Sequence, residues 1–521
     1  MTGLTPFRNE PLTDFSIPAN RDAFQAAIDY VRAHLGQTYP LRIGAEERLT
    51  GETITSINPS RPAEVVGVVA SGRQSDAVDA IRVAAEAFES WRFVDPRERA
   101  RYLLRAAAAM RKRKHEFSAW MVFEIGKSWA EADADTAEAI DFLEYYARQA
   151  IRLTEANSLL VPYPGEEADL QYIPLGVGAV IPPWNFPNAI MTGMTSAAIV
   201  AGNAVVLKPA SITPIIAYKF CELLWENGLP PGVLNFLPGP GSAIGDTIVD
   251  HPQTRFIAFT GSKEIGMRIF ERASKVHPGQ LWLKRTVLEM GGKDAVVVDE
   301  TANLESAAEG IVTSAFGFQG QKCSAGSRAI IVDSVYSTVE ARVVERTKAL
   351  TQGAPDLGAH IHQGPVSDKK AMQKILEYIE VGTQEGRLLC GGKALVTPEG
   401  GYFIEPTVFG DVPPQARIAQ EEIFGPVLAM IRARDYDHAL AIANGTEFGL
   451  TGAVYSQNRE RLERARREFH VGNLYFNRKC TGALVGVQPF GGFNMSGTDS
   501  KAGGPDYLLL FTQAKSITER L

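Results

Sequence analysis

The pattern of hydrophobic and polar positions predicts a helix-rich opening to the chain. Phe24, Ile28 and Val31 recur at helical spacing within an amphipathic stretch from about 13 to 35. The same periodicity continues over 75–91, 96–125 and 128–152, which predicts longer helices there. We therefore expect an N-terminal helical arm over residues 1–45, followed by further helices.

After these helices, short apolar runs are separated by turn residues. Runs at 159–163 and 170–173 flank the turn-rich sequence PGEEA at 164–168, a pattern that predicts a protruding hairpin. Strand-like segments then alternate with helical ones, and we expect strands at 178–181, 204–207, 233–237, 255–259 and 294–298. This alternation is typical of a parallel sheet covered by helices on both faces.

A second region of alternating strands and helices follows residue 301 and runs to about 496. Its strand candidates lie at 329–332 and 428–432. The apolar sequence YLLLFT at 507–512 is β-prone, and we expect it to pair with another element or subunit. The fold class predicted by these patterns is α/β, with two parallel-sheet domains and a small β flap.

One uncharged stretch, from Leu170 to Leu207, is long enough in principle to cross a bilayer. Its prolines, among them Pro182 and Pro183, interrupt any continuous helix, and Asn203 would need a hydrogen-bond partner in lipid. We therefore expect buried strand, loop and helix here, and no membrane partner.

Composition narrows the classes of partner and compartment. Of the 521 residues, 53 are basic and 60 are acidic, a net charge of −7 without long blocks of one sign, so we expect no nucleic-acid partner. The four cysteines lie far apart without a CxxC pair, and the first residues show no export or presequence pattern, which favours a cytoplasmic protein. Only His360 and His362 form a close histidine pair, and we expect them in an exposed loop rather than in a metal site.

Candidate chemistry begins with Cys323, in the loop sequence GFQGQKCSAG at 317–326. Small and polar neighbours leave a thiol approachable, and Lys322 with flanking amides can stabilise its thiolate; a buried structural cysteine is the alternative. Glu289 lies just before Gly291 and Gly292 in LEMGGKD. Its environment there could raise its pKa for general-base work, although such an acid is often only a loop residue.

Two further segments suit an oxyanion and a cofactor. Asn185 lies between prolines in PPWNFP at 182–187, which fixes its amide as a donor to an oxyanion or, alternatively, as a turn former. FTGS at 259–262 joins a strand to a helix start that can bind a phosphate. Neither this sequence nor GPGSAIG at 239–245 has the GxGxxG spacing, so the sequence lacks the ordinary dinucleotide fingerprint.

Taken in order, these segments resemble the aldehyde dehydrogenase superfamily over nearly the whole chain. The matching motifs are PPWNFP at 182–187, KPAS at 208–211, FTGS at 259–262, LEMGG at 288–292, GQKC at 320–323 and EEIFGP at 421–426. The resemblance implies NAD(P)-dependent oxidation of an aldehyde, with Cys323 as the nucleophile, Glu289 as the general base and Asn185 as the oxyanion donor. It implies no metal.

The resemblance also implies a cofactor site. The cofactor-binding residues would be Pro183, Trp184, Lys208, Ser211, Gly241, Gly245, Gly261, Ser262, Glu422 and Phe424. Many members that prefer NAD have Glu at the position of Ser211, and the neutral side chain removes a repulsion against the 2′-phosphate of NADP. We expect NAD as the cofactor, with NADP also accepted.

Within the superfamily, the chain most resembles members that oxidise L-glutamate γ-semialdehyde, in equilibrium with 1-pyrroline-5-carboxylate, to L-glutamate in the second step of proline catabolism. Ser324 and the amides of Gly482 and Ala483 could hold the α-carboxylate, and two phenylalanine rings could flank the aliphatic chain. The expected substrate-binding residues are Glu138, Phe186, Lys322, Ser324, Gly482, Ala483 and Phe490. If the Gly482 loop is only a turn, the substrate becomes another small aldehyde or semialdehyde.

The resemblance implies a three-part architecture. We expect a dinucleotide-binding domain over 46–158 and 175–289, a catalytic domain over 290–498, and an oligomerisation flap over 159–174 and 499–521. Through the flap we expect a homo-oligomer, either a dimer or a larger assembly, and proline dehydrogenase is the expected pathway partner. A catalytically silent nucleotide-binding or structural protein is the alternative from another class, and the intact set of Cys323, Glu289 and Asn185 argues against it.

Overall fold

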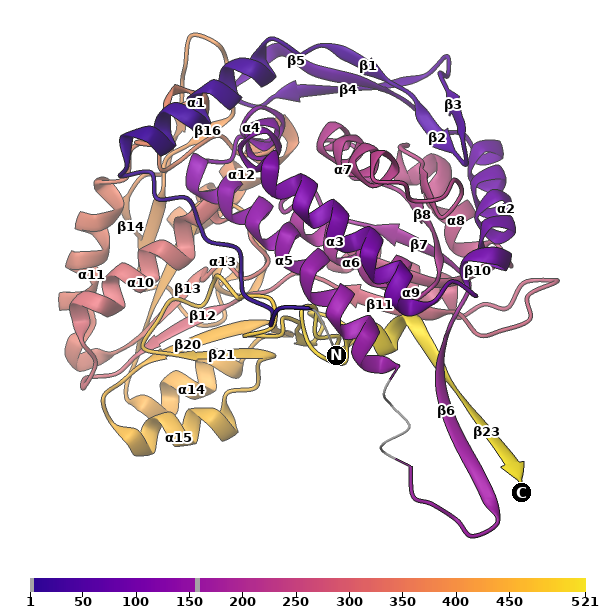
Figure 1. Ribbon diagram of the computed structural model, residues 1–521. Coiled ribbons are helices and arrows are strands. Elements are labelled where there is room, and N and C mark those ends of the chain that lie inside the picture. The colour runs from indigo at the N-terminus through magenta and orange to yellow at the C-terminus, as the bar shows by residue number, and fades with distance from the viewer. Residues whose placement is uncertain (1–3, 155–159) are drawn as a thin grey trace.

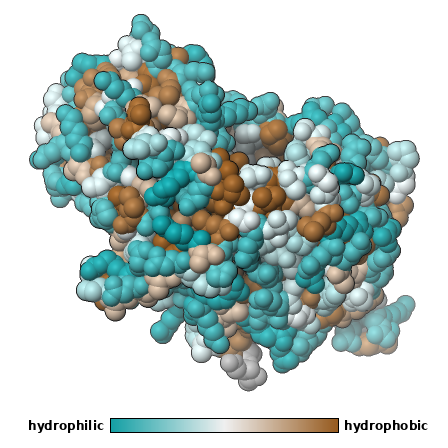
Figure 2. All heavy atoms as spheres, turned by 90° about the horizontal axis from the view of Figure 1, so that it is seen from above, coloured by the Kyte–Doolittle hydropathy of each residue, from teal (hydrophilic) through white to brown (hydrophobic). Residues whose placement is uncertain are grey.

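The computed structural model describes residues 4–154 and 160–521, which form two lobes and an extended flap (Figure 1). Figure 2 shows the lobes side by side, with a hollow between them along which hydrophobic residues gather. The predicted α/β fold class is confirmed, because each lobe is built on a 7-stranded sheet made mainly of parallel strands.

The first lobe contains the sheet with strand order β11-β10-β7-β8-β9-β2-β3. Its strands are β2 (Leu41–Ile43), β3 (Glu46–Arg48), β7 (Val177–Ile181), β8 (Ala204–Leu207), β9 (Leu234–Phe236), β10 (Thr254–Thr260) and β11 (Arg285–Glu289). Strands β7 to β11 pair in parallel, and β2 and β3 form an antiparallel edge. The strands predicted at 178–181, 204–207, 233–237 and 255–259 are therefore confirmed.

Alternate residues of each strand face opposite cores, as the period of two along a strand requires. On β10, Phe256 and Ala258 lie in one hydrophobic core, whereas Ile257 and Phe259 lie in the other. Helices α2 (Gln74–Trp91), α8 (Asp246–Asp250) and α9 (Lys263–Ala273) pack on the Ile257 side. Helices α6 (Ala189–Val200) and α7 (Pro214–Glu226) pack on the Phe256 side.

Helices α3 (Pro96–Lys112), α4 (Lys114–Ile125) and α5 (Trp129–Leu153) form a further layer over α6 and α7 (Figure 1). The single helix predicted over 96–125 is wrong. The helices break at Arg113, and Lys114 turns inward so that its Nζ lies 3.0 Å from a carboxylate oxygen of Asp133 on α5. Helix α4 ends at Gly126 with φ 69°, a left-handed cap that glycine adopts without strain.

The N-terminal helix α1 (Pro18–Arg32) buries Phe24, Ile28 and Val31, as its periodicity predicted. It begins at Pro18 rather than near residue 13, because Thr13 belongs to an extended arm whose amide and hydroxyl donate to Asp133. A 3-stranded sheet follows, with the order β1-β5-β4. Its strands are β1 (Gln37–Tyr39), β4 (Thr53–Asn58) and β5 (Arg61–Ala70).

The second lobe contains the sheet with strand order β14-β17-β18-β13-β12-β20-β21. Its strands are β12 (Ala295–Val298), β13 (Arg328–Val332), β14 (Arg387–Cys390), β17 (Thr407–Gly410), β18 (Val427–Ala433), β20 (Thr451–Tyr455) and β21 (Asn473–Phe476). All neighbours pair in parallel except β14, which is antiparallel to β17. The strands predicted at 294–298, 329–332 and 428–432 are confirmed as β12, β13 and β18.

Helices cover both faces of the second sheet. Val296 and Val298 of β12 face α10 (Leu304–Phe316) and α11 (Asp333–Lys348), whereas Ala295 and Val297 face the opposite core. The helices on that side are α12 (Lys369–Glu385), α13 (Arg417–Gln420), α14 (Tyr436–Asn444) and α15 (Arg459–Glu468). Short strands β15 (Ala394–Leu395) with β16 (Phe403–Ile404), and β19 (Phe448–Gly449) with β22 (Phe493–Asn494), complete this lobe.

The flap consists of β6 (Glu166–Pro174) paired antiparallel with β23 (Thr512–Arg520), and it extends away from both lobes (Figure 1). The hairpin predicted between 159–163 and 170–173 is therefore wrong: β6 pairs with the C-terminal strand, and only an isolated bridge joins Tyr163 to Glu166. Leu159 of the first run lies outside the described residues. The C-terminal strand pairs with β6, but of the run predicted to pair, 507–512, only Thr512 belongs to it.

The position of that C-terminal strand differs from the prediction. Residues 507–511 form the 3₁₀ helix η5 (Tyr507–Phe511), and the strand begins only at Thr512. Tyr507, Leu508 and Phe511 are buried in the hydrophobic core of the first lobe. Their apolar side chains reflect this burial, and the neighbouring strand β23 is polar because it is exposed.

The uncharged stretch from 170 to 207 folds as predicted, into the end of β6, then β7, α6 and β8. Helix α6 is buried on nearly every side, which accounts for its lack of polar face. In the portions of the chain that the structure describes, we find no helix with the length and apolar character that a bilayer span requires.

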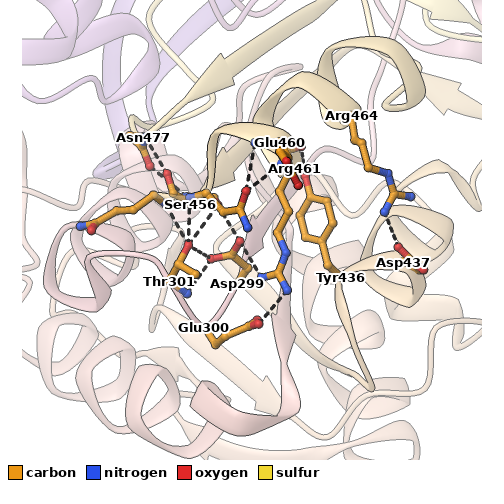
Figure 3. Close-up of polar contacts among 12 residues, drawn as sticks. Asp299, Glu300, Thr301, Tyr436, Asp437, Ser456, Glu460, Arg461, Arg464 and Asn477 are labelled. Atoms are coloured by element: carbon orange, nitrogen blue, oxygen red, sulfur yellow. Dashed lines mark hydrogen bonds and ion pairs between the residues drawn. The ribbon is translucent and has the colours of Figure 1, made fainter.

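A polar cluster closes the carboxyl ends of β12 and β20, an edge at which α/β sheets often bind ligands (Figure 3). The Asp299 carboxylate is fully buried and accepts hydrogen bonds from the Thr301 hydroxyl at 2.7 Å and the Ser456 hydroxyl at 2.6 Å. It also accepts one from Arg461 Nη1 at 3.0 Å. These groups satisfy one another, so the cluster holds this edge together, and the chemistry lies at the opposite edge.

Candidate active site

Cys323 lies in a loop at the amino end of β13, where three consecutive residues turn the chain sharply. The 3₁₀ helix η3 (Gly317–Gly320) contains Phe318 and Gln319 with φ values of 46° and 56°, and Gly320 has a φ of 66°. A Cβ on Gly320 would lie 2.2 Å from the Gly425 carbonyl oxygen, so only glycine fits there. This turn brings Cys323 to a partly exposed position at the edge of the sheet.

Glu289 ends β11 and is buried beside the C-terminal segment of the catalytic lobe. Its Oε1 accepts a short hydrogen bond from the Ser500 hydroxyl, and its Oε2 has no partner among the described residues. Burial raises the pKa of Glu289 to about 8, against the opposing effects of Ser500 and Lys501. A carboxyl with this pKa can exchange a proton near neutral pH, which suits a general base.

The turn after Glu289 approaches the Cys323 loop closely. A Cβ on Gly292 would lie 2.7 Å from the Cys323 carbonyl oxygen, so a glycine is needed for this approach. Burial, together with Asp294, Glu289 and Glu422, raises the pKa of the Cys323 thiol well above its ordinary value. The thiol is therefore protonated in this state, and its proton must leave before it can act as a nucleophile.

Lys322 does not pair with the neighbouring thiol. Its Nζ forms an ion pair at 2.7 Å with Glu131 on α5. Because the Glu131 carboxylate already pairs with the Lys322 ammonium, the structure does not show the expected stabilisation of the Cys323 thiolate by Lys322.

Asn185 is placed to donate a hydrogen bond beside Cys323. Its buried side chain lies in the loop between β7 and α6, and its Nδ2 donates to the Gln321 carbonyl oxygen at 3.0 Å. Gln321 precedes Cys323 by two residues, so the amide group is held at the nucleophile's loop. The prolines around Asn185 restrict this loop further, as the sequence indicated.

The predicted cofactor residues gather at the carboxyl ends of the first sheet. Strand β7 is the point at which the strand order reverses, since β8 lies on one side of it and β10 on the other. Such a switch point is where open α/β sheets bind nucleotides. Pro183 and Trp184 follow β7, Lys208 follows β8, and Gly261 and Ser262 follow β10.

Local features of these residues fit a nucleotide. The Lys208 ammonium is buried with only a 3.4 Å contact to the Pro209 carbonyl oxygen, and burial lowers its pKa to about 8. Ser262 caps helix α9, whose N-terminus offers backbone amides to a phosphate. A Cβ added to Gly241 or Gly245 would meet no atom within 4 Å, so open space lies above both.

Two of the residues predicted to hold the nicotinamide half, Glu422 and Phe424, come from the second lobe. Gly292 N donates to Glu422 Oε1 at 3.0 Å, which fixes that carboxylate beside the turn of the catalytic base. The Phe424 ring meets the Trp184 ring edge-on, with centroids 5.4 Å apart. The two lobes therefore meet at the cofactor site, and Ser211 lies exposed toward the other end of it.

The predicted substrate residues come from four separate segments. Glu138 lies on α5, where burial and Asp135 raise its pKa to about 8. The Gly482 carbonyl oxygen accepts from Arg478 at 3.0 Å, whereas the amides of Gly482 and Ala483 donate to no group in the described parts of the chain. The amides are thus available to an anion.

The remaining predicted substrate residues are Ser324, Phe186 and Phe490. Ser324 follows Cys323 directly and is buried. Phe490 exchanges backbone hydrogen bonds with Ala502, and the Phe186 ring centre lies 4.0 Å from Lys127 Nζ. That the two rings flank a substrate stays a prediction.

Sequence reasoning missed several residues that surround this site. Ser500 and Lys501 act on Glu289, and a buried pair, Lys127 with Asp135, lies behind Phe186. One signal was available for the pair: Glu131, Asp135 and Glu138 recur at helical spacing on α5, which puts acids on one buried face. Ser500 carried no such signal, because its contact with Glu289 joins residues 211 positions apart.

Potential metal ligands lie apart from one another in the described chain. The residues that the structure describes include no group of three or more His, Cys, Asp or Glu side chains arranged to hold a metal ion. His360 and His362 are both exposed in a loop, as predicted.

Comparisons with known proteins agree with the site. A family profile described as "Aldehyde dehydrogenase family" matches residues 46–517. The chain is 62% identical over 514 residues to the 1-pyrroline-5-carboxylate dehydrogenase of Geobacillus kaustophilus (strain HTA426), covering 99% of both chains. It is similar to the structure of 1-pyrroline-5-carboxylate dehydrogenase from Thermus with bound NAD, with TM-score 0.98, 53% identity and 100% coverage of both chains.

A third relative is longer. The structure of proline utilization A from Bdellovibrio bacteriovorus matches with TM-score 0.96 and 44% identity, covering 99% of this chain and 53% of that chain. The similarity to this longer protein therefore spans only about half of its length.

Proposed function

This chain belongs to the aldehyde dehydrogenase family, and we propose that it oxidises L-glutamate γ-semialdehyde to L-glutamate with NAD, the second step of proline catabolism. The observation that carries the proposal is the convergence of Cys323, Glu289 and Asn185 at the junction of two lobes. Full-length relatives named for this activity support the substrate.

The first chemical step is attack by Cys323 Sγ on the aldehyde carbon. Cys323 is partly exposed, so its thiol proton can pass to solvent water before the attack. The carbonyl oxygen becomes an oxyanion, and Asn185 Nδ2 together with a backbone amide of the nucleophile loop stabilises it. The product of this step is a hemithioacetal on Cys323.

The second step is release of the acid. After loss of hydride the substrate is a thioester on Cys323, and a water molecule attacks its carbonyl carbon. Glu289 in its ionised form takes the proton of that water, and the thiolate leaves and is reprotonated. The buried pocket around Glu289 keeps its pKa near 8, so the carboxylate is basic enough for this task.

Residues of both lobes fit NAD. The buried and nearly unpaired Lys208, the open space above Gly241 and Gly245, and the free helix end at Ser262 suit an adenosine diphosphate group. Glu422 and Phe424 would hold the nicotinamide half, beside Trp184. When bound, NAD accepts the hydride that leaves the substrate carbon.

Substrate recognition follows from the charges of the semialdehyde. Its α-carboxylate needs donors, which the free amides of Gly482 and Ala483 and the Ser324 hydroxyl supply. Its α-ammonium needs an acceptor, and we assign this role to the Glu138 carboxyl on α5. Lys322 contributes through its ion pair with Glu131, which holds the nucleophile loop against α5 and does not stabilise the thiolate.

We also propose a homo-oligomer built on the flap. Strand β23 leaves most of its residues exposed, among them Ile517, and the exposed Leu281 lines the same cavity as residues of β6 and β23. A second copy of the chain would cover such a surface. We place the protein in the cytoplasm, in keeping with its four free cysteines.

A pathway partner completes the proposal. We propose that proline dehydrogenase supplies the substrate, which is supported by the similarity of this chain to half of a proline utilization protein.

Initial rates of NADH formation test the substrate. L-glutamate γ-semialdehyde should give a kcat/KM about tenfold or more above propanal and succinate semialdehyde, and Cys323→Ala should abolish the rate with all three. Equal or higher rates with the other aldehydes would leave the chemistry standing and remove the assignment to proline catabolism.

A further inference from the structure

A fully buried ion pair lies directly behind the predicted active site. Lys127 Nζ and Asp135 Oδ2 are 2.7 Å apart, and both side chains have 0% exposure. Lys127 follows the left-handed cap Gly126 that ends α4, and Asp135 lies in the second turn of α5. None of the chemical steps above uses either residue.

The pair supports the loop that carries the oxyanion donor. Asp135 Oδ1 accepts a hydrogen bond of 2.6 Å from the amide of Ala189, the first residue of α6. Lys127 Nζ lies 4.0 Å from the centre of the Phe186 ring, a cation–π contact made by a fully buried ammonium. The segment from Asn185 to Ala189 is thus attached to the pair at Phe186 and at Ala189.

The same pair supports the loop that carries the nucleophile. Lys127 Nζ lies 4.7 Å from the centre of the Phe318 ring, in the strained turn before Cys323. The next residue, Gln319, donates from Nε2 to the Pro365 carbonyl oxygen at 2.8 Å. One ammonium therefore contacts an aromatic ring from each of the two loops that must meet for the reaction.

Stability alone is a poor reason for such a pair. Removing two ions from water costs several kcal/mol for each ion, and apolar residues of similar volume often replace a buried pair without loss of stability. Burial lowers the pKa of Lys127 and raises that of Asp135, which expresses this cost. The geometry that the pair imposes on its neighbours is a better reason, because each contact has a defined direction.

We propose that Lys127 and Asp135 are positioning residues that hold Asn185 and Phe186 against the Cys323 loop, and so determine the preference for the semialdehyde over shorter aldehydes. The inference rests on the proposed function for the identity of the substrate. It assigns a role to a pair that touches neither substrate nor cofactor and acts through the two loops.

The test variant replaces both charges together. In Lys127→Met with Asp135→Asn, the amide oxygen at 135 still accepts from Ala189, and no uncompensated ion remains. We expect kcat/KM for the semialdehyde to fall about tenfold or more, because a small displacement of reacting groups is costly. The ratio of kcat/KM between the semialdehyde and propanal should also fall, since only the longer substrate uses the Phe186 ring fully.

A matched control exists in the same helical hairpin. Lys114 and Asp133 form an ion pair at 3.0 Å with side-chain exposures of 10% and 2%, but they bind the N-terminal arm at Pro11 and Thr13. The variant Lys114→Met with Asp133→Asn should alter the thermal midpoint without changing the semialdehyde-to-propanal ratio.

The outcomes separate the two proposals. A double variant at 127 and 135 that keeps wild-type kcat/KM and the wild-type ratio overturns the positioning role. If that variant does not fold, Phe318→Leu removes one of the two rings from the Lys127 ammonium, leaves the ion pair intact and gives the same test through the same ratio. Failure of the proposed function would appear differently, as a wild-type enzyme that does not prefer the semialdehyde.

Discussion

We propose that Ser211 determines whether the site accepts the 2′-phosphate of NADP. Its side chain is small, neutral and exposed, so it does not repel a 2′-phosphate. Ser211→Glu should lower kcat/KM with NADP by about tenfold or more, because two like charges would be placed together. The rate with NAD should change little, and parallel initial rates with the two cofactors measure the difference. Equal losses with both cofactors would contradict this role.

The pKa of Glu289 determines how the rate depends on pH. Burial raises this pKa to about 8, so the carboxyl is mostly protonated at pH 7 and becomes the active base as the pH rises. Acyl-enzyme hydrolysis should therefore increase with pH up to about 8 and then level off. A pH profile of single-turnover hydrolysis measures it, and Glu289→Gln should remove the dependence. A profile that is unchanged in the variant would exclude Glu289 as the base.

At the scale of residues, the sequence can predict site residues that lie within recognisable sequence motifs. The motifs around Cys323, Glu289 and Asn185 alone left structural alternatives open, and the resemblance to a family is what predicted their roles. Lys127 could not be assigned a role, because its partner and its two aromatic contacts come from three separate segments. Tertiary packing alone brings these groups together.

At the scale of elements, the cluster around Asp299 tests how the second sheet is held (Figure 3). Asp299→Ala would leave the Thr301 and Ser456 hydroxyl groups without their buried acceptor, whereas Arg461 keeps its ion pair with Glu300 at 2.7 Å, so the free energy of unfolding should fall by about 1–3 kcal/mol. Urea denaturation measures this change.

The control lies in the same view. Asp437 pairs with Arg464 at 2.5 Å, but its side chain is 74% exposed. Asp437→Ala should cost no more than about 1 kcal/mol, because water screens an exposed pair. Comparable losses in the two variants would mean that the burial of Asp299 is not what makes its cluster important.

Element prediction succeeded where burial and periodicity agree. Strand β8 is a fully buried apolar run and was predicted at its observed bounds, and α2 was predicted from its helical spacing to within one residue. It failed where apolar residues are buried without being in a strand. The run at 507–512 is apolar because η5 packs into the core, and strand β23 beside it is polar. Periodicity alone does not distinguish these cases.

At the scale of the whole molecule, the active site needs both lobes. The first sheet presents its carboxyl ends to the cofactor, and the second presents the amino ends of β12 and β13 with Cys323. The sequence could predict two α/β units. It could not predict how the edges of the two sheets face each other, because that arrangement depends on the α3–α5 layer and on contacts across it.

The flap should govern assembly. Removing residues 513–521 leaves β6 without its partner strand, so an unpaired edge replaces the two-stranded flap. We expect the truncated protein to lose its oligomeric form while keeping the core of each lobe. Light scattering after size-exclusion chromatography measures the mass. An assembly of unchanged mass would show that the flap is not the interface.

The most direct test of the mechanism is to trap the acyl-enzyme. Glu289→Gln mixed with NAD and L-glutamate γ-semialdehyde should release a single burst of NADH, and mass spectrometry of the quenched protein should find a glutamyl thioester on the Cys323 peptide. Cys323→Ala should give neither signal. NADH formation without a covalent product on Cys323, or a product on another cysteine, would contradict the account.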